Sequence, residues 1–197
     1  MFGQKRKYQQ TTDEQLVSNM QCGDHVAFNE LYNRYSNRLL YYFYRMLGNS
    51  NEKAQDFLQD IFVKIIDNIH TFDTSRKFST WAFSIAHNMC KNEYRSMEIR
   101  KNSPIDDYSD TLECPEELPV VDFANTEDFI RDLFCELENF DEIHKTVFLL
   151  HYREGFSLKD IAQTLEISEG TVKSRLFYTR KRLAERLIKY HPHFVNE

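Results

Sequence analysis

The sequence predicts an all-α protein with two small helical domains joined by an acidic flexible linker, the second domain containing a helix-turn-helix. Apolar residues recur at three- and four-residue steps over most of the chain, as they do on the buried side of helices. Glycine and proline, which interrupt helices, number only 5 and 4 among 197 residues. A hydrophobic fraction of 41% is enough to form a buried core, so we expect a folded protein.

The charges divide the chain into three parts. Residues 1–103 hold 14 basic and 11 acidic residues (net +3), residues 104–139 hold 1 and 12 (net −11), and residues 140–197 hold 10 and 8 (net +2). A block of one sign is typical of a solvated, poorly packed linker, and three prolines within it disfavour helix. The overall charge of −6 therefore conceals two mildly basic modules.

The first domain is expected at residues 13–103, with four helices. The first helix begins near Thr12 or Asp13, and the fourth runs from about Ser79 to about Arg100. The second helix ends at Gly48, and its apolar stripe comprises Phe28, Leu31, Tyr35, Leu39, Tyr42 and Met46. The stripe of the third helix comprises Ala54, Leu58, Ile61, Ile65 and Ile69. We interpret these stripes as core.

The acidic linker is expected at residues 104–128 and the second domain at residues 129–190. A first helix of this domain is indicated by Phe129, Leu133 and Leu137. A second helix, which ends near Gly155, is indicated by Ile143, Val147 and Leu150. The helix-turn-helix follows these two helices.

Residues 157–176 have the capping and packing residues that are typical of a helix-turn-helix. Ser157 can cap the first helix with Asp160 in its first turn, and Ser168 can cap the second. Ala162 is small where two helices must cross closely, and Val172 fills the partner position. The second helix presents polar and basic residues near its N-terminal end, where recognition helices meet base edges and phosphates in the major groove of DNA.

A simpler interpretation of this segment is an amphipathic hairpin with a solvated basic side. The joint occurrence of two caps, the Ala162 and Val172 pair and the polar and basic residues of the second helix favours DNA binding instead. One residue departs from the usual pattern, because Glu166 occupies the turn position where glycine is common. That departure costs some stability if the backbone there needs a positive φ.

An aromatic and basic stretch at residues 72–88 is a candidate surface for single-stranded nucleic acid. Stacking on unpaired bases requires aromatic rings and phosphate contacts require cations, and this stretch combines both around Arg76 and Lys77. Trp81 could equally pack into the helix core. The polar loop 73–77 is therefore the better functional candidate.

Several kinds of protein are excluded by what the sequence lacks. The four cysteines are scattered without metal-ligand spacing, so we expect reduced thiols, no metal and no cofactor. Neither a Gly-rich phosphate loop nor a nucleophile elbow occurs, so we do not expect an enzyme. No run approaches the roughly 18 apolar residues of a membrane span, so we expect a cytoplasmic protein without membrane insertion.

Three motifs follow one another at residues 54–64, 78–88 and 169–176, with the sequences AQDFLQDIFVK, FSTWAFSIAHN and EGTVKSRL. In this order and spacing they resemble the conserved regions of the extracytoplasmic-function (ECF) group of bacterial RNA polymerase sigma factors, within the sigma-70 superfamily. The resemblance covers about 13–103 and 130–190. It implies an alternative sigma factor that binds core RNA polymerase, recognises the −35 and −10 promoter elements and initiates transcription.

The resemblance also implies a role for each motif. Docking on the clamp helices of the polymerase β′ subunit is implied for Asp56, Gln59, Asp60, Phe62 and Lys64. Capture of the melted, single-stranded −10 element is implied for Asp73, Thr74, Ser75, Arg76, Lys77, Phe78, Ser79, Trp81, His87 and Asn88. Reading of the −35 duplex is implied for Ser168, Glu169, Thr171, Val172, Lys173, Ser174, Arg175, Tyr178 and Arg182.

Further partners are implied by the same resemblance. The second domain would contact the β flap of the polymerase, the acidic linker would run toward the RNA exit path, and an anti-sigma factor would hold the protein inactive. One departure is the Leu-Pro pair common at the start of the family's second domain, which here is Asn139-Phe140. We expect this departure to alter helix geometry at most.

A two-domain transcriptional regulator is the alternative function. Such a protein would bind duplex DNA through residues 157–182 without core-binding, and would use its first module to dimerise or to sense a ligand. It predicts DNA binding without polymerase, whereas a sigma factor acts in the holoenzyme.

Overall fold

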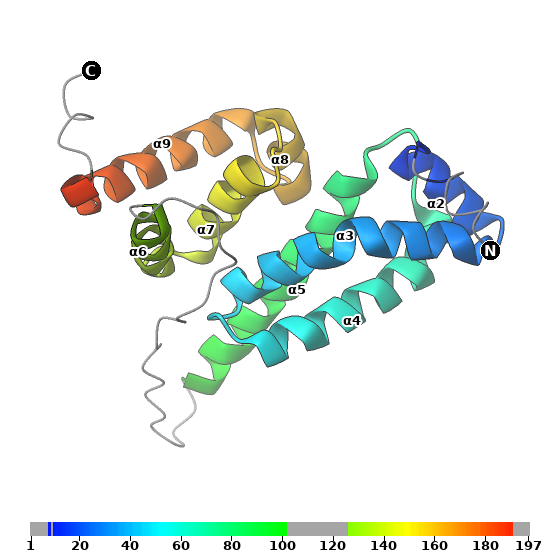
Figure 1. Cartoon of the computed structure of the whole chain (residues 1–197), viewed down its shortest axis with the longest axis horizontal. Helices are drawn as coiled ribbons and strands as arrows, with labels where there is room; N and C mark the ends of the chain where they lie inside the picture. The colour runs from blue at the N-terminus through cyan, green and yellow to red at the C-terminus, as the bar shows by residue number, and fades with distance from the viewer. Residues whose placement is uncertain (1–7, 9, 102–125, 191–197) are drawn as a thin grey trace. The chain divides into compact units, whose positions relative to one another are not determined.

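The computed structural model describes Tyr8 and residues 10–101 and 126–190 (Figure 1). All regular structure in these residues is helical, which confirms the all-α prediction, and they divide into two compact units. Most of the predicted acidic linker, residues 104–125, lies outside the described residues.

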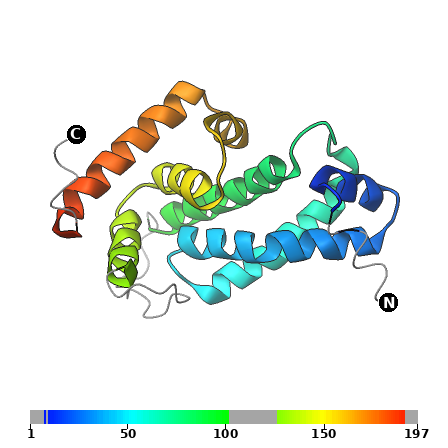
Figure 2. The same cartoon turned by 45° about the horizontal axis from the view of Figure 1, so that its top comes forward.

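The first unit is a bundle of three long helices with a short helix at one end. In chain order it contains α2 (Asp13–Gln21), α3 (His25–Met46), α4 (Asn51–Asn68), the 3-10 turn η1 (Ile69–Thr71) and α5 (Phe78–Lys101). Helix α3 contacts both α4 and α5, while α2 contacts α3, η1 and α5. Figures 1 and 2 both show α2 at the end of the bundle where α3 begins.

Short polar side chains set the helix boundaries of this unit. Thr12 caps α2 in a capping box with Gln15, Asp24 caps α3, and Ser50 caps α4. Gly48 follows α3 with a φ of 73°, a conformation that glycine adopts without steric cost. The predicted start near Thr12 and the predicted end at Gly48 are therefore confirmed.

The core of the first unit consists of the predicted stripes. Every stripe residue of the second and third predicted helices is buried except Phe28, which is partly exposed. Helix α5 adds Phe78, Ala82, Phe83, Ala86 and Cys90 from its inner side, all with 0% exposure. Three helices thus bury one side each and leave the other side to solvent.

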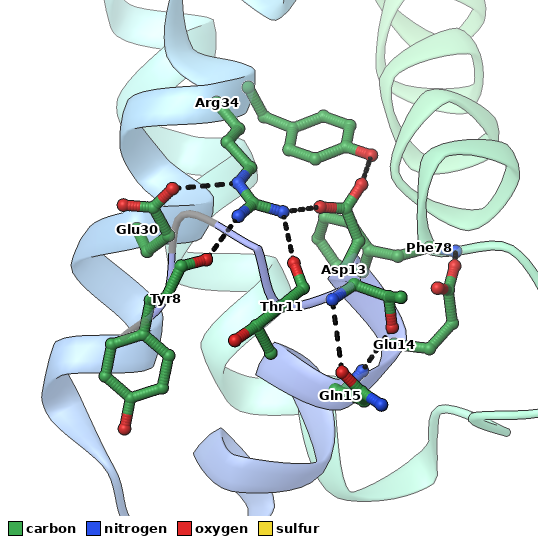
Figure 3. A network of polar contacts seen from close by, with 10 residues as sticks. Tyr8, Thr11, Asp13, Glu14, Gln15, Glu30, Arg34 and Phe78 are labelled. Carbon is green, nitrogen blue, oxygen red and sulfur yellow. Dashed lines mark hydrogen bonds and ion pairs between the residues drawn. The ribbon is translucent and has the colours of Figure 1, made fainter. Parts of the chain in front are cut away.

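A polar network centred on Arg34 fastens the N-terminal part of the chain to α3 (Figure 3). The guanidinium of Arg34 donates to Asp13 Oδ1 at 2.7 Å and to Glu30 Oε1 at 2.9 Å. It also donates to the backbone carbonyls of Tyr8 at 2.6 Å and Thr11 at 2.9 Å. Because a guanidinium has five donors in one plane, a single side chain can hold this whole segment.

The second unit is built around its longest helix, α9. In chain order it contains α6 (Thr126–Glu138), α7 (Glu142–Phe148), the π-helical turn η2 (Leu149–Arg153), α8 (Leu158–Leu165), α9 (Glu169–Arg186) and the 3-10 turn η3 (Ile188–Tyr190). Helix α9 contacts α6, α7 and η3. Helix α6 begins at Thr126, so the last residues that we placed in the linker, 126–128, are helical.

Helices α8 and α9 form the predicted helix-turn-helix. Ser157 caps α8 in a capping box with Asp160, and Ser168 accepts a hydrogen bond from the Thr171 amide at the start of α9. Ala162 and Val172 are both buried, at 8% and 0% exposure. The two caps and the small and apolar pair therefore take the roles that the sequence predicts.

The turn between α8 and α9 requires a left-handed residue. Glu166 has φ 54° and ψ 42°, and its amide donates to the carbonyl of Ala162 at the end of α8. A side chain in this conformation is sterically disfavoured, which is the cost that the sequence led us to expect.

We predict that Arg34→Met lowers the free energy of unfolding by about 3 kcal/mol, because it removes the charged donor of the Asp13 and Glu30 carboxylates and of two backbone carbonyls. Urea denaturation followed by circular dichroism measures the change. The matched control is Arg95→Met, an exposed arginine of α5, for which we expect a change below about 0.5 kcal/mol. Similar losses in both variants would show that the network adds nothing specific.

We predict that Glu166→Gly raises the free energy of unfolding by about 1 kcal/mol, since glycine adopts the left-handed conformation without strain. The control is Glu185→Gly, the same substitution at an exposed position in the last turn of α9, which should lower the free energy of unfolding by up to about 1 kcal/mol. Thermal and urea denaturation measure the change in the free energy of unfolding of both variants. A destabilised Glu166→Gly would contradict the strain that we assign to the turn.

Candidate polymerase and nucleic-acid interfaces

The exposed side of α4 carries most of the residues predicted to bind polymerase. Asp56, Gln59, Asp60 and Lys64 are all exposed. They lie away from the buried stripe of α4 because helical periodicity turns these positions outward. Two carboxylates and an amide therefore face solvent within about one turn of one another.

Phe62, the fifth predicted polymerase contact, belongs to the core instead. Its side chain is 5% exposed, and its ring centroid lies 6.1 Å from that of Phe28 and 4.6 Å from that of Tyr32. The physical reason is position, because residue 62 falls beside Ile61 and Ile65 on the inner side of the helix. The structure thus separates Phe62 from the four exposed residues of the same motif.

Two apolar residues of α4 that the sequence analysis missed lie exposed near these carboxylates. Val63 is 56% exposed and Ile66 is 46% exposed. Their signal in the sequence is that both fall outside the apolar stripe and yet are β-branched hydrophobic residues. Exposed apolar side chains rimmed by polar ones are typical of a protein-binding surface.

The loop 73–77 is exposed along its whole length, while both of its ends are buried. Phe72 before the loop is 6% exposed and Phe78 after it is 0% exposed. Within the loop, the Asp73 carboxylate accepts from the Ser75 amide at 2.9 Å, and the Asp73 carbonyl accepts from the Arg76 amide at 3.0 Å. The hydrogen bonds from Ser75 lower the pKa of the Asp73 carboxyl, so this residue is an anion that shapes the turn.

Aromatic rings close the base of this loop. The ring centroids of Phe72 and Phe78 lie 6.0 Å apart, and Trp81 packs on both, at 4.9 Å from Phe72 and 5.8 Å from Phe78. Tyr35 of α3 meets Phe78 edge to face at 4.9 Å. Trp81 remains partly exposed, so it both supports the loop and keeps some surface toward solvent.

The remaining residues predicted for the −10 element divide between surface and core. Asn88 is exposed and Ser79 is partly exposed, whereas Phe78 and His87 are buried. Burial, and then the positive charge of Lys91, lower the pKa of His87 to about 4. Phe78 and His87 are therefore core residues of α5, because both positions lie on its inner side.

Helix α9 presents most of its predicted DNA-reading residues outward. Exposed positions are Ser168, Glu169, Lys173, Ser174, Tyr178 and Arg182, and Thr171 and Arg175 are partly exposed. Val172 is 0% exposed and packs inside the second unit, so it supports the helix rather than reaching DNA. The Ser168 hydroxyl is already engaged by the Thr171 amide at 3.1 Å.

A hollow of about 450 Å³ adjoins the C-terminal half of this helix. It is lined by Phe140, Asp141, His144, Tyr178 and Arg182, and the Arg182 guanidinium lies 4.7 Å from the centre of the Phe140 ring. Phe177, which the sequence analysis did not single out, is 59% exposed beside Tyr178. Large aromatic rings at the surface of a basic helix are suited to contact a partner.

Metal and membrane sites are not found in the described part of the chain. No cluster of three or more His, Cys, Asp or Glu side chains there is arranged to hold a metal ion, and no described helix is both long and apolar enough to cross a bilayer. Cys22 and Cys90 lie outside any disulfide, as expected.

The two units match known families separately. Residues 31–98 match the family model of sigma-70 region 2, and residues 135–183 match that of sigma-70 region 4. A bundle of the first kind followed by a helix-turn-helix of the second kind defines an RNA polymerase sigma factor, a class of DNA-binding regulatory subunits.

Curated relatives narrow this class. The ECF RNA polymerase sigma factor SigW of Bacillus subtilis is 34% identical over 183 residues, which is 87% of this chain and 94% of SigW. The ECF RNA polymerase sigma-E factor of Haemophilus influenzae is 32% identical over 187 residues, covering 91% of this chain and 97% of the relative. The chain therefore belongs to the ECF group of the sigma-70 family. It is an alternative sigma factor that initiates transcription, as the sequence motifs predict.

Solved structures share the fold. CnrH, determined in complex with the cytosolic domain of CnrY, has a TM-score of 0.66 at 22% identity and covers 90% of this chain and 97% of its own. The sigma factor RpoE of Bartonella quintana, determined with the anti-sigma factor NepR, has a TM-score of 0.65 at 21% identity and covers 82% and 96%. These similarities confirm the predicted architecture of two helical domains.

We predict that His87 makes stability depend on pH. Its pKa is about 4 in the folded protein and about 6.5 in the unfolded chain, so the unfolded chain binds more protons between these values. The stability that His87 contributes is complete above pH 6.5 and is lost as the pH falls toward 4, by up to about 3 kcal/mol.

Urea denaturation of the wild type and His87→Gln between pH 7.5 and 4.5 measures this loss. His87→Gln should flatten the pH profile, whereas His70→Gln, at an exposed histidine, should leave it unchanged. Parallel profiles for the wild type and His87→Gln would contradict the buried, neutral state of this imidazole.

Proposed function

We propose that three surfaces divide the work of this sigma factor. The exposed side of α4 binds the β′ clamp helices of core RNA polymerase, the loop 73–77 captures the melted −10 strand, and α9 reads the −35 duplex. The proposed domains are 13–103 and, with the start of α6 included, 126–190, joined by the acidic segment 104–125. The observation that carries the proposal is a fully exposed loop, with Arg76 and Lys77, held between buried aromatic ends.

The composition of the α4 surface supports polymerase binding. Asp56, Gln59 and Asp60 offer acceptors to a basic partner, and Val63 and Ile66 offer apolar area that water leaves on association. Charged groups at the edge of such a surface set the rate and specificity of association more than its affinity. We therefore add Val63 and Ile66 to the predicted contacts and assign Phe62 a supporting role.

The loop 73–77 has the chemistry that a single strand requires. Arg76 and Lys77 can neutralise phosphates, and the partly exposed Trp81 at the base of the loop offers an aromatic surface to a base. An extruded base also needs hydrogen-bonding groups at its edge, which Thr74 and Ser75 supply. Phe78 and His87 act from the core, by fixing α5 beneath the loop.

The N-terminal half of α9 has the chemistry that a major groove requires. Lys173 and Ser174 project from it, Arg175 is partly exposed beside them, and the exposed Tyr178 follows at the start of the C-terminal half. Lysine and arginine contact phosphates or guanine edges, and a hydroxyl contacts several bases. Val172 anchors the helix from within, so the exposed side chains keep a fixed orientation.

The remaining partners follow from the family and from solved structures. We propose that the second domain contacts the β flap and that an anti-sigma factor regulates the protein. The last point is supported by the complex of RpoE with the anti-sigma factor NepR.

We predict that substitutions in each of the three surfaces block a different step of initiation. Multi-round transcription uses core RNA polymerase and a promoter selected from genomic fragments by the intact holoenzyme. Asp56→Ala/Gln59→Ala should weaken core binding about tenfold or more, measured by fluorescence anisotropy of labelled protein. The control Glu98→Ala removes an exposed carboxylate from α5 and should leave core binding unchanged.

The two DNA surfaces are separated by their substrates. Arg76→Ala/Lys77→Ala should retain binding to core and to the −35 duplex but lose binding to the −10 strand. Lys173→Ala/Arg175→Ala should retain binding to core and to the −10 strand but lose binding to the −35 duplex. Each lost phosphate contact should also reduce the slope of log affinity against log salt by about 1. Core binding that survives the α4 substitutions, or selected promoter DNA bound equally well without core, would refute the proposed division.

A further inference from the structure

We propose that α2 is a brace that positions the −10 loop, and that Glu14 and Gln21 are its positioning residues. Between them they hold the chain on both sides of residues 73–77, from a helix that none of the motifs includes. This inference rests on the proposed function of the loop. It assigns to the first described helix a role in promoter specificity without any contact to DNA.

Gln21 holds the chain that enters the loop. Its side-chain amide, Nε2, donates to the carbonyl of Ile69 at 2.8 Å and to the carbonyl of Phe72 at 3.1 Å. These carbonyls lie where α4 and η1 end; that of Ile69 also accepts from the Phe72 amide at 3.2 Å. One amide group therefore fixes the backbone immediately before Asp73.

Glu14 holds the chain that leaves the loop, as Figure 3 shows. Its Oε1 accepts from the Phe78 amide at 3.0 Å. The carbonyl of Lys77 accepts from the Trp81 amide, so Lys77 stands at the capping position of α5. Because a lysine side chain has no acceptor, it cannot cap a helix, and the carboxylate of Glu14 serves instead. Its negative charge also suits a helix N-terminus.

Both contacts come from one rigid element. Leu16 and Val17 of α2 are 0% exposed, and Asp13 is bound by Arg34 and by the Tyr35 hydroxyl. Glu14 and Gln21 lie near the two ends of this helix, so the helix itself fixes the distance between their hydrogen-bonding side chains. Both ends of the five-residue loop are thus hydrogen-bonded to the same helix.

We expect the brace to affect the orientation of the loop 73–77 more than the stability of the first unit. Phe72, Phe78 and Trp81 already close the base of the loop by packing, and Leu16 and Val17 bury α2 independently of its polar ends. Loss of Glu14 and Gln21 contacts should leave this core in place while freeing the backbone at both ends of the loop. A loop that is ordered before binding pays less conformational entropy when it captures a strand, and it discriminates better between bases.

The test compares Glu14→Ala/Gln21→Leu with the wild type in full-length protein and in reconstituted holoenzyme. The probes are single-stranded oligonucleotides of the −10 region of the selected promoter, each with one base changed. We expect discrimination between the cognate and changed bases to fall about tenfold, as three hydrogen bonds near the loop are lost. Melting temperature and core affinity should stay close to those of the wild type.

Trypsin provides a readout that needs no DNA. Arg76 and Lys77 are exposed cleavage sites within the loop, so we expect the variant to be cut there about tenfold faster. Glu14→Gln keeps an oxygen that can accept from the Phe78 amide, so in combination with native Gln21 it should restore both readouts. The control Ser18→Ala changes an exposed residue of the same helix and should behave as wild type.

The outcomes separate this inference from the proposed function. If Arg76→Ala/Lys77→Ala abolishes capture of the −10 strand while Glu14→Ala/Gln21→Leu changes neither discrimination nor cleavage, the brace is refuted and the loop assignment stands. If cleavage is faster but Arg76→Ala/Lys77→Ala leaves capture unchanged, the loop assignment fails and the specificity role of the brace fails with it. If the melting temperature and the core affinity fall together with discrimination, α2 has a purely structural role and the brace is refuted.

Discussion

A helix that packs on its neighbours through one stripe of apolar side chains must leave its other side to solvent, and the two helical interfaces proposed for this protein, on α4 and α9, use that constraint. In α4 the stripe from Ala54 to Ile65 fixes the direction in which Asp56 and Asp60 project. In α9 the buried Val172 and Leu176 do the same for Lys173 and Ser174. The core therefore determines where partners bind, although no core residue touches them.

The same constraint explains how far the sequence could predict the site. The helix start near Thr12, the caps at Ser157 and Ser168 and the turn at Glu166 depend on local spacing and are confirmed, as are the stripes of α3 and α4 apart from the partly exposed Phe28. Phe62, Phe78, His87 and Val172 were assigned to interfaces because they lie within motifs, but a motif records both the exposed residues and the core residues that support them. Periodicity applied within each motif would have separated the two kinds.

Other features could not be predicted, because they depend on tertiary contacts. Gln21 meets Ile69 and Phe72 across 48 and 51 positions of the chain, and Glu14 meets Phe78 across 64. No local pattern distinguishes a glutamine at a helix end that binds distant carbonyls from one that is solvated. The absence of an acceptor at Lys77 was visible in the sequence, and it indicates that α5 needs a cap from elsewhere.

These long separations along the chain matter while the protein is being synthesised. A ribosome completes α2 more than fifty residues before Phe78, so Glu14 has no amide to accept from until the loop and the start of α5 have emerged. Contacts of such high sequence separation form slowly, because the entropy of closing the intervening chain opposes them. The contact between Glu14 and the chain that leaves the loop 73–77 therefore forms only when the start of the helix that follows the loop is present.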